Sequence, residues 1–186
     1  MVIDRRTRKT KAAIQAEFVQ LMTQKAINEI TIRELAAGAD INRRTFYLHY
    51  TDIYDLLHQT EDTVIEQFQT TLMTFELPAT GHSAGQAFFK LILQYVYANR
   101  TLLHVLCQNP DSELMNKLVK MTISEGQTVI PFKHPANATY LLNYCCWGLI
   151  GILHTALRQN SVDFDALDQL VDQLLIHSLA VDELID

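Results

Sequence analysis

The chain has 186 residues, 48% of them hydrophobic, and a formal net charge of −6. This length accommodates one large domain or two small ones, each with its own core. There is no apolar run of about 18 residues and no secretory signal at the start, which argues against a membrane protein and predicts a cytoplasmic one. The three cysteines include the adjacent Cys145 and Cys146, a pair unsuited to an ordinary structural disulfide, which favours a reducing compartment.

Basic residues are concentrated at the N-terminal end of the chain. Residues 1–60 contain nine Lys or Arg and seven Asp or Glu, a net of +2, whereas the remaining 126 residues have a net of −8. Five of the nine cations form a basic arm, which consists of Arg5, Arg6, Arg8, Lys9 and Lys11. We expect this arm to bind nucleic-acid phosphates, while the acidic remainder stays away from them. A solvated basic tail is the alternative for a charge run that stands alone.

The hydrophobic pattern predicts a first helix over about residues 7–25, with Ile14, Phe18, Leu21 and Met22 on one side. This apolar side is expected to pack against the segment that follows.

Residues 31–50 predict two short helices joined by a tight turn. Thr31 and Glu34 have the spacing of a capping box, in which each side chain bonds the backbone amide of the other residue. The first of these helices is expected to end at Gly38 to Asp40. Asn42 is suited to cap the second helix. The segment is therefore predicted to be a helix-turn-helix.

The second helix of this pair, expected over about residues 43–49, has cations at its first turn. A helix-turn-helix inserts this end of its second helix into the major groove of DNA. Arg43 and Arg44 can bond guanine edges and the Thr45 methyl can touch thymine, whereas Phe46 is expected in the core. The predicted contacts with double-stranded DNA come from Thr31, Arg33, Asn42, Arg43, Arg44, Thr45, Tyr47 and His49.

The run from Thr31 to Tyr54 resembles the DNA-binding domain of the TetR family of bacterial one-component regulators. The resemblance is carried above all by Thr45-Phe46-Tyr47 followed by His49-Tyr50, and it is specific over roughly residues 7–57. It implies a homodimer that binds a roughly palindromic DNA operator.

Two positions depart from the family pattern. Asp40 stands where the family usually has Gly, and Thr51 stands where many members have a phosphate-binding Lys. We expect the turn to survive and Thr51 to cap the next helix, while one phosphate contact is in doubt.

Beyond Thr51 the periodicity predicts helices almost throughout, with breaks at Pro78–Gly81 and Thr128–Pro135. The first is a helix of about 25 residues from Thr51, which in the resembling family transmits the signal. The others are expected over about residues 83–98, a short stretch through Leu103 and Leu106, 110–126, 136–158 and 164–184.

The last two predicted helices are strongly apolar on one side, and an isolated monomer would leave part of this surface exposed. A two-fold interface of four helices would bury it. The resemblance implies dimerisation at the same place in the chain. The interface is expected to include Leu149, Ile152, Leu167, Leu170, Val171 and Leu174.

Residues 83–158 are rich in aromatic residues, as the lining of a pocket for a small hydrophobic or amphipathic effector would be. Ordinary helical packing is the alternative for the same residues. The candidates are Phe89, Ile92, Tyr95, His104, Met121, Tyr144 and Trp147.

An enzyme is not favoured, because the sequence has no glycine-rich phosphate loop, serine elbow or metal-ligand spacing. We therefore expect no cofactor and no metal. The predicted protein is all-α, with a three-helix DNA-binding domain over residues 1–50 and a larger helical effector-binding and dimerisation domain over residues 51–186. The predicted function is a transcriptional repressor released by a small molecule. An activator, or a partner-driven DNA-binding protein without a small-molecule ligand, is the alternative.

Overall fold

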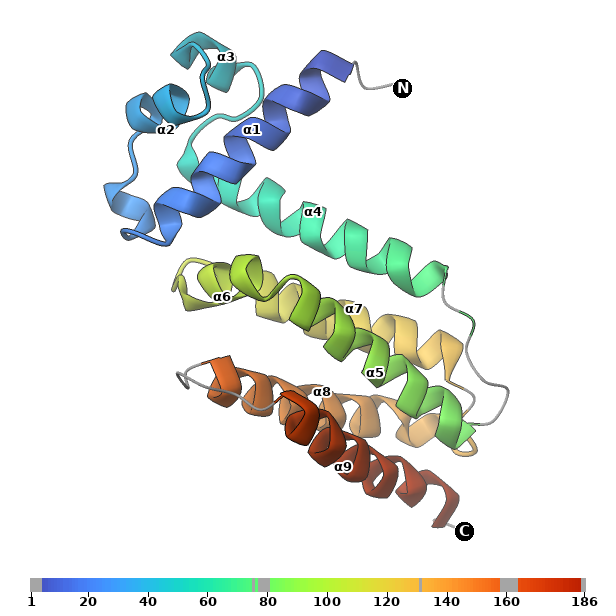
Figure 1. Cartoon of the computed structure of the whole chain (residues 1–186). Helices are drawn as coiled ribbons and strands as arrows, with labels where there is room; N and C mark the ends of the chain where they lie inside the picture. Colours follow the sequence, from blue (N-terminus) through green and yellow to red (C-terminus); the bar gives the residue numbers. More distant parts are fainter. Residues whose placement is uncertain (1–4, 75, 77–80, 131, 158–163, 185–186) are drawn as a thin grey trace. The chain divides into compact units, whose positions relative to one another are not determined.

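The computed structural model describes residues 5–74, 76, 81–130, 132–157 and 164–184 (Figure 1). Every regular element in these ranges is a helix, which confirms the all-α class. In chain order they are α1 (Arg5–Met22), the 3-10 helix η1 (Ile27–Glu29), α2 (Ile32–Gly38), α3 (Arg43–Tyr47), α4 (Ile53–Met73), α5 (Gly81–Ala98), α6 (Arg100–Gln108), α7 (Leu114–Val129), α8 (Pro135–Leu157) and α9 (Phe164–Leu184). None of the helices described is long and apolar enough to span a membrane.

The chain forms two compact units. The N-terminal unit comprises Met1–Val64 together with Thr101–Leu114, and the C-terminal unit comprises Ile65–Arg100 together with Met115–Asp186. Helix α6 thus belongs to the N-terminal unit, although it lies far beyond residue 50 in the sequence. The domain boundary at residue 50 stays a prediction.

The core of the N-terminal unit is formed by one apolar face from each of its helices. Ile14 and Phe18 of α1 are fully buried, as their spacing of four predicts. They share the core with Leu35 of α2, Phe46 of α3 and Leu56 of α4. Helix α2 contacts both α1 and α3. These contacts fix α3 on a rigid support.

A buried carboxylate joins α4 to the segment that follows α6. The Glu61 side chain is fully buried, and its Oε1 accepts hydrogen bonds from Ser112 Oγ at 2.7 Å and from the Glu113 amide at 3.0 Å. Leu103 and Leu106 of α6 are buried on the same unit. These contacts explain why residues 101–114 belong to the N-terminal unit.

Because of the same contacts, α7 begins later in the chain than the sequence predicts. A helix beginning at Pro110 is predicted from the Asn109-Pro110 pair, but the helix begins at Leu114. Asn109 Oδ1 accepts from the Asp111 amide at 3.0 Å, and Ser112 Oγ accepts from the Leu114 amide at 3.3 Å. The prediction was wrong because Glu61 binds Ser112 and the Glu113 amide from outside the helix.

The C-terminal unit has its core between α5, α7, α8 and α9, and α9 packs against both α5 and α8. The core includes Phe88, Phe89, Leu142 and Leu175. Helix α7 continues past the predicted end at Gly126, where a Cβ would lie 2.7 Å from a Leu142 methyl. Gly126 therefore permits close packing on α8 and does not end the helix. The predicted breaks at Pro78–Thr80 and Pro131 lie outside the described residues.

Candidate nucleic-acid interface

Side-chain caps fix the start of α2. The Thr31 hydroxyl oxygen accepts a hydrogen bond from the Glu34 amide at 3.3 Å, which confirms half of the predicted capping box. The Glu34 carboxylate does not reach back to the Thr31 amide. It accepts from the Thr31 hydroxyl at 3.0 Å and forms an ion pair with Lys25. A lysine ammonium competes for this carboxylate because a charged donor binds it more strongly than a neutral amide.

The turn between α2 and α3 depends on Asp40, whose φ is 52°, the only positive φ among the residues described. This confirms the left-handed conformation expected at the position where glycine is usual. Asn42 then begins α3, because its Oδ1 accepts from the Arg44 amide at 2.8 Å. The turn and the cap together set the direction in which α3 leaves α2.

Helix α3 has one buried and one exposed side. Phe46 is buried and its ring lies 5.5 Å from the Tyr50 ring and 5.6 Å from the Tyr47 ring. Arg43 and Arg44 are exposed, and Tyr47 is 53% exposed. A helix held on one side by a buried ring leaves its opposite side, with its two cations and its phenol, exposed to solvent.

Leu48, directly after α3, is a further candidate that sequence analysis did not single out. Its side chain is 73% exposed, although leucine is usually buried. It follows Tyr47 on the exposed part of this segment, and its methyl groups can contact a thymine methyl. Its position between Tyr47 and His49 was the available signal, because helical spacing places it away from buried Phe46.

His49 and Tyr50, the two residues after Leu48, are both less exposed than Tyr47 and Leu48. His49 is half-buried, and burial together with the charge of Lys11 lowers the pKa of its imidazole. Tyr50 is almost fully buried, and burial raises the pKa of its phenol to about 12. Lys11 Nζ lies 5.4 Å from the centre of the Tyr50 ring and donates to Gln59 Oε1 at 3.0 Å.

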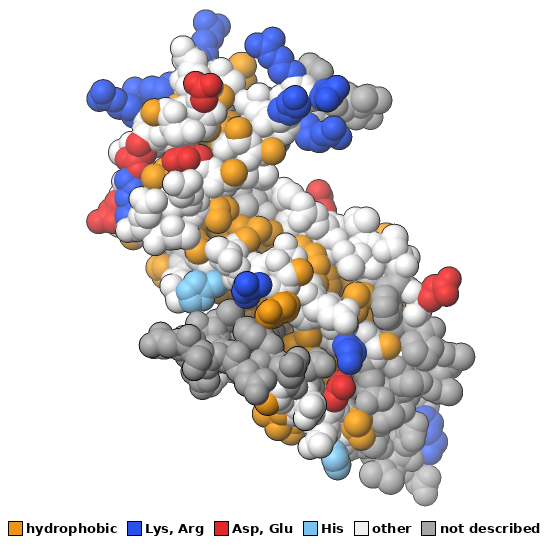
Figure 2. Space-filling model, viewed as in Figure 1, with side chains coloured by type: hydrophobic (Ala, Val, Ile, Leu, Met, Phe, Trp, Pro, Cys, Tyr) orange, Lys and Arg blue, Asp and Glu red, His pale blue; other side chains and the backbone are white. Residues whose placement is uncertain are grey.

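The basic arm forms the first turns of α1. Arg5, Arg6, Arg8 and Lys9 are exposed, whereas Lys11 is half-buried and held by the contacts just described. In the view of Figure 2, Lys and Arg side chains gather over the part of the N-terminal unit that contains α1–α3. Four of the five arm cations are thus exposed to solvent, and they are carried on a helix.

The start of α4 is occupied by its own carboxylates. Asp52 Oδ1 accepts from the Asp55 amide at 2.8 Å, and Asp55 Oδ2 accepts from the Thr51 amide at 2.8 Å. The helix cap is therefore Asp52, and the expectation that Thr51 caps α4 was wrong. Aspartate is the better cap because it adds a charge that the helix dipole favours. Hydrogen bonds to Gln59 and Thr51 lower the pKa of Asp55, which keeps it anionic.

The remaining predicted DNA contacts lie on the same unit. Thr31, Arg33 and Asn42 are exposed, and Thr45 is half-buried. The hydroxyl of Thr31 and the amide oxygen of Asn42 are engaged as caps, so these two residues position the helices. Arg33 extends the cationic surface.

The predicted pocket residues have very different surroundings. Phe89 and Met121 are buried, and Ile92 packs against the core of the C-terminal unit. Tyr95 stacks on Phe68 with ring centres 4.6 Å apart. Tyr144 and Trp147 are 69% and 51% exposed on α8. His104 is in the N-terminal unit, where it lines a groove.

The predicted interface residues also divide into two sets. Leu149 and Val171 are buried in the core of the C-terminal unit, and Ile152 packs against that core. Leu170 and Leu174 are about half exposed on α9, and Leu167 is intermediate. Within the described chain, no group of three or more His, Cys, Asp or Glu side chains is placed to hold a metal ion.

Two capped helices joined by a left-handed residue, with cations exposed on the second, define a helix-turn-helix protein. Residues 17–60 match the family model of bacterial regulatory proteins of the tetR family. The N-terminal part of the chain is therefore similar to the bacterial regulatory proteins of the tetR family. This family consists of regulators that bind DNA operators and typically dimerise, and its members are generally not enzymes. The search of curated proteins gave no match.

Solved structures have the same fold over nearly the whole chain. A transcriptional regulator of the TerR/AcrR family from Aquifex aeolicus VF5 is 16% identical, with a TM-score of 0.62, and the match covers 92% of this chain and 98% of that one. A TetR transcriptional regulator from Rhodococcus sp. RHA1 is 10% identical, with a TM-score of 0.52 and coverages of 94% and 95%. The TetR family repressor AlkX from Dietzia sp. strain DQ12-45-1b, implicated in biodegradation of n-alkanes, is 12% identical, with a TM-score of 0.50 and coverages of 94% and 96%.

Proposed function

We propose that this protein is a homodimeric repressor of the TetR family that binds a palindromic operator and is released by a small-molecule effector. One observation carries the proposal: α3 exposes Arg43, Arg44 and Tyr47 while buried Phe46 holds its other side. Arginine side chains at the first turn of a recognition helix can make bidentate bonds to guanine. A similar solved structure is a repressor, AlkX, which supports repression as the direction of control.

An exposed apolar surface supports the homodimer. On α8 it contains Tyr140, Tyr144 and Trp147, which are 77%, 69% and 51% exposed at helical spacing. On α9 it contains Leu170 and Leu174, spaced by four. We call these five residues the α8–α9 apolar face. Large apolar patches are rare on monomeric proteins, and a two-fold partner presents an identical surface that covers them.

Two glycines of α8 favour the same interface. A Cβ built on Gly148 or Gly151 would meet no atom within 4 Å, so neither glycine is required by packing within the chain. Small residues at an exposed helix surface allow a second helix to approach closely. This supports an interface that includes α8 as well as α9, with the buried Leu149 and Val171 behind it in the core.

The proposal is tested by selecting binding sites for the full-length protein from random double-stranded DNA. We expect an inverted repeat whose half-sites lie about one turn, or about 34 to 36 Å, apart. The variant with both Arg43→Ala and Arg44→Ala should enrich no sequence. Lys120→Ala removes an exposed cation from α7 and serves as the matched control, with the wild-type motif expected.

Transcription from a promoter carrying the selected site then gives the direction of control. Repression lowers the transcript level, whereas a rise would support the alternative, an activator. Failure of the wild-type protein to enrich any sequence would remove the operator-binding proposal altogether.

A further inference from the structure

The connection between α3 and α4, residues 48–52, is bonded to side chains of α4. Gln59 donates through Nε2 to the His49 carbonyl at 3.4 Å and to Asp55 Oδ1 at 3.0 Å. Asp55 Oδ2 in turn accepts from the Thr51 amide at 2.8 Å and from the Thr51 hydroxyl at 3.3 Å. Two points of the connection are therefore tied to the beginning of α4.

Lys11 of α1 completes this set of bonds. Its Nζ donates to Gln59 Oε1 at 3.0 Å. The same atom lies 5.4 Å from the centre of the Tyr50 ring, within the range of a cation–π contact. Tyr50 is buried in the middle of the connection. Lys11 thus contacts the connection directly through this ring and indirectly through Gln59.

The orientation of the Gln59 amide follows from its partners. The Lys11 ammonium can only donate, so it bonds the amide oxygen. The His49 carbonyl and the Asp55 carboxylate can only accept, so they bond the amide nitrogen. A flipped amide would lose all three bonds. Lys11 therefore favours the one orientation in which Gln59 can hold the connection.

Helices α1 and α4 are joined by a second side-chain bond in the same register. Gln15 Nε2, one turn after Lys11, donates at 3.5 Å to the hydroxyl of Thr63, which lies one turn after Gln59. The two helices therefore lie side by side along this stretch, and the position of Lys11 over the connection is set by helix packing.

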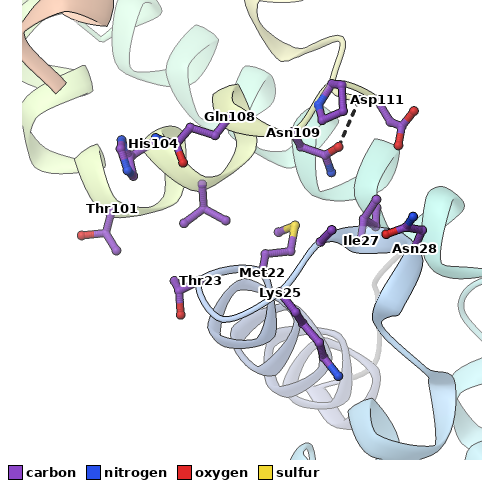
Figure 3. Close-up of a pocket in the computed structure, with 13 residues that line it drawn as sticks. Met22, Thr23, Lys25, Ile27, Asn28, Thr101, His104, Gln108, Asn109 and Asp111 are labelled. Atoms are coloured by element: carbon purple, nitrogen blue, oxygen red, sulfur yellow. Dashed lines mark hydrogen bonds between the residues drawn. The ribbon is translucent and has the colours of Figure 1, made fainter. Parts of the chain in front are cut away.

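Lys25 shows that a cation of this unit can serve inside it. It forms an ion pair with Glu34 of α2, and Figure 3 shows its side chain extending away from α6. Both Lys25 and Lys11 are half-buried, whereas the four cations at the start of α1 are exposed. Lys11 therefore has the surroundings of an internal lysine and differs from the rest of the basic arm.

We propose that Lys11 is a positioning residue for operator binding, which fixes the α3–α4 connection through Gln59 and the Tyr50 ring. Helix α3 spans only Arg43–Tyr47, and its exposed last residue directly precedes this connection. The bonds of Lys11 thus set where the end of the helix lies. The inference rests on the proposed function, since it assigns the residue that orients the helix proposed to read the operator.

A positioning residue and a phosphate contact affect DNA binding differently. A cation on a phosphate strengthens binding to every sequence and adds about 0.9 to the slope of log affinity against log salt concentration. A residue that orients α3 acts only where side chains must meet particular bases. Its loss lowers affinity for the operator but leaves affinity for unrelated DNA and the salt slope unchanged.

The test compares Lys11→Met with Lys9→Met. Methionine has nearly the length and helix propensity of lysine and packs well on an aromatic ring, so Lys11→Met removes little except the charge and the donor. Lys9 is exposed on the same helix and provides the matched control. Fluorescence anisotropy over a range of salt concentrations gives the affinities for the selected operator and for a duplex of equal length with scrambled half-sites.

We expect Lys11→Met to lower operator affinity about tenfold or more, with unchanged affinity for the scrambled duplex and an unchanged salt slope. Lys9→Met should leave the ratio of the two affinities as it is in the wild type. Gln59→Met removes no charge and should reproduce the loss seen in Lys11→Met. The double variant should lose no more than Gln59→Met alone, because Lys11 acts through Gln59.

Circular dichroism at the temperature of the binding assay shows whether each variant is folded. Gln59→Glu replaces either methionine variant at residue 11 or 59 that is not. It keeps an acceptor for Lys11 but has no donor for the His49 carbonyl, so operator affinity should fall relative to the scrambled duplex. An equal loss for both duplexes with a shallower salt slope in Lys11→Met would make Lys11 a phosphate contact and overturn the proposal. Unchanged operator affinity would overturn it as well.

A second readout needs no DNA. Three amides of the connection are hydrogen-bonded and have protection to lose, those of His49, Tyr50 and Thr51. Their hydrogen exchange should be at least about tenfold faster in Lys11→Met and unchanged in Lys9→Met. Equal exchange in both variants would show that Lys11 does not hold the connection. If the wild-type protein selects no operator, the proposed function fails, and hydrogen exchange still distinguishes that failure from failure of the Lys11 contacts.

Discussion

At the scale of single residues, the geometry of the recognition helix depends on a few side chains with specific tasks. Asp40 adopts the left-handed backbone, Asn42 caps α3 and Phe46 holds its inner side. None of the three needs to touch DNA to matter, because each sets where Arg43 and Arg44 lie. Two predictions concern residues at this scale.

Replacing Asp40 with glycine is expected to stabilise the protein. A non-glycine residue in the left-handed region costs roughly 1 to 2 kcal/mol, and glycine avoids this cost. Part of the stability gained is lost again, because an unfolded chain with glycine has more conformational entropy. We expect the free energy of unfolding to rise by up to about 1 kcal/mol in urea titrations. Ala39→Gly is the control, because Ala39 has a φ of −77° and should lose stability. Equal or lower stability of Asp40→Gly would contradict the argument.

Arg43→Ala and Arg44→Ala are expected to differ in kind. Both side chains are exposed at the start of α3. Because adjacent residues lie on different faces of a helix, only one of the two can point to base edges, and the other meets the sugar-phosphate backbone of DNA. One variant should lose about 1 to 3 kcal/mol of operator binding and relax the preference at one base position. The other should weaken binding to all sequences alike. Binding-site selections on both variants measure this, and unchanged preference and affinity in both would exclude α3 from the groove.

At the scale of elements, the helices begin where side chains or tertiary bonds satisfy their first amides. Helix α2 begins after Thr31 and α3 after Asn42, as their sequence predicts. Helix α7 begins four residues later than predicted, because Glu61 of α4 binds the preceding turn. Local caps therefore account for the N-terminal helices, whereas contact with another helix sets the start of α7.

The first turns of α1 should supply affinity without specificity. Replacing Arg5, Arg6, Arg8 and Lys9 together with alanine keeps the helix but removes four exposed cations. The logarithm of operator affinity should then fall less steeply with the logarithm of salt concentration, by about 0.9 for each phosphate that the variant no longer neutralises. Fluorescence anisotropy over a range of salt concentrations gives the slope. An unaffected slope would mean that these side chains are solvated and do not contact DNA.

Acid should weaken the cap of α2. The hydrogen bond and charge of Lys25 lower the pKa of Glu34 below its ordinary value of 4.5. The pKa of Glu34 is lower in the folded protein than in the unfolded chain, so ionised Glu34 stabilises the folded protein above pH 4.5. This stabilisation is lost as the pH falls through the pKa of the folded protein. We therefore expect the free energy of unfolding to decrease on acidification below pH 4.5, and to decrease less in Glu34→Gln. The same pH dependence in both proteins would assign the acid sensitivity to other carboxyl groups.

At the scale of the whole molecule, the α8–α9 apolar face determines the assembly that we propose. A dimer brings two recognition helices to one palindromic site, which a single chain cannot occupy. In the proposed function, repression and effector control would both depend on this pairing, because an effector would have to alter how well two helices fit two half-sites at once.

Leu174→Glu is expected to dissociate the dimer. Leu174 is exposed on α9 within the chain, so the substitution leaves the core of the monomer intact. In a dimer it would bury an unpaired carboxylate, which is strongly unfavourable. Analytical ultracentrifugation should show a monomer, while Gln173→Glu, which adds the same charge at an adjacent exposed position, should remain a dimer. A dimer in both variants would place the interface elsewhere.

The sequence alone determined the class of protein, because the signals for it are local. Caps at Thr31 and Asn42, a residue that accepts the left-handed backbone at Asp40 and the run from Thr45 to Tyr50 all lie within twenty residues. Helix signals depend on neighbours three or four positions away, so the elements could also be predicted, apart from the 3-10 helix η1 and several ends.

Only the tertiary structure decided which part of the protein packs against the apolar face of each helix. A periodic stripe shows that a helix has an apolar side but does not identify the side's partner. Leu149 and Val171, expected at an interface, are buried within the chain, whereas Tyr144 and Trp147, expected in a pocket, are exposed. Likewise α6 joined the N-terminal unit because buried Glu61 bonds Ser112, 51 residues away. Contacts over such a separation leave no periodic signal, and only the folded chain reveals them.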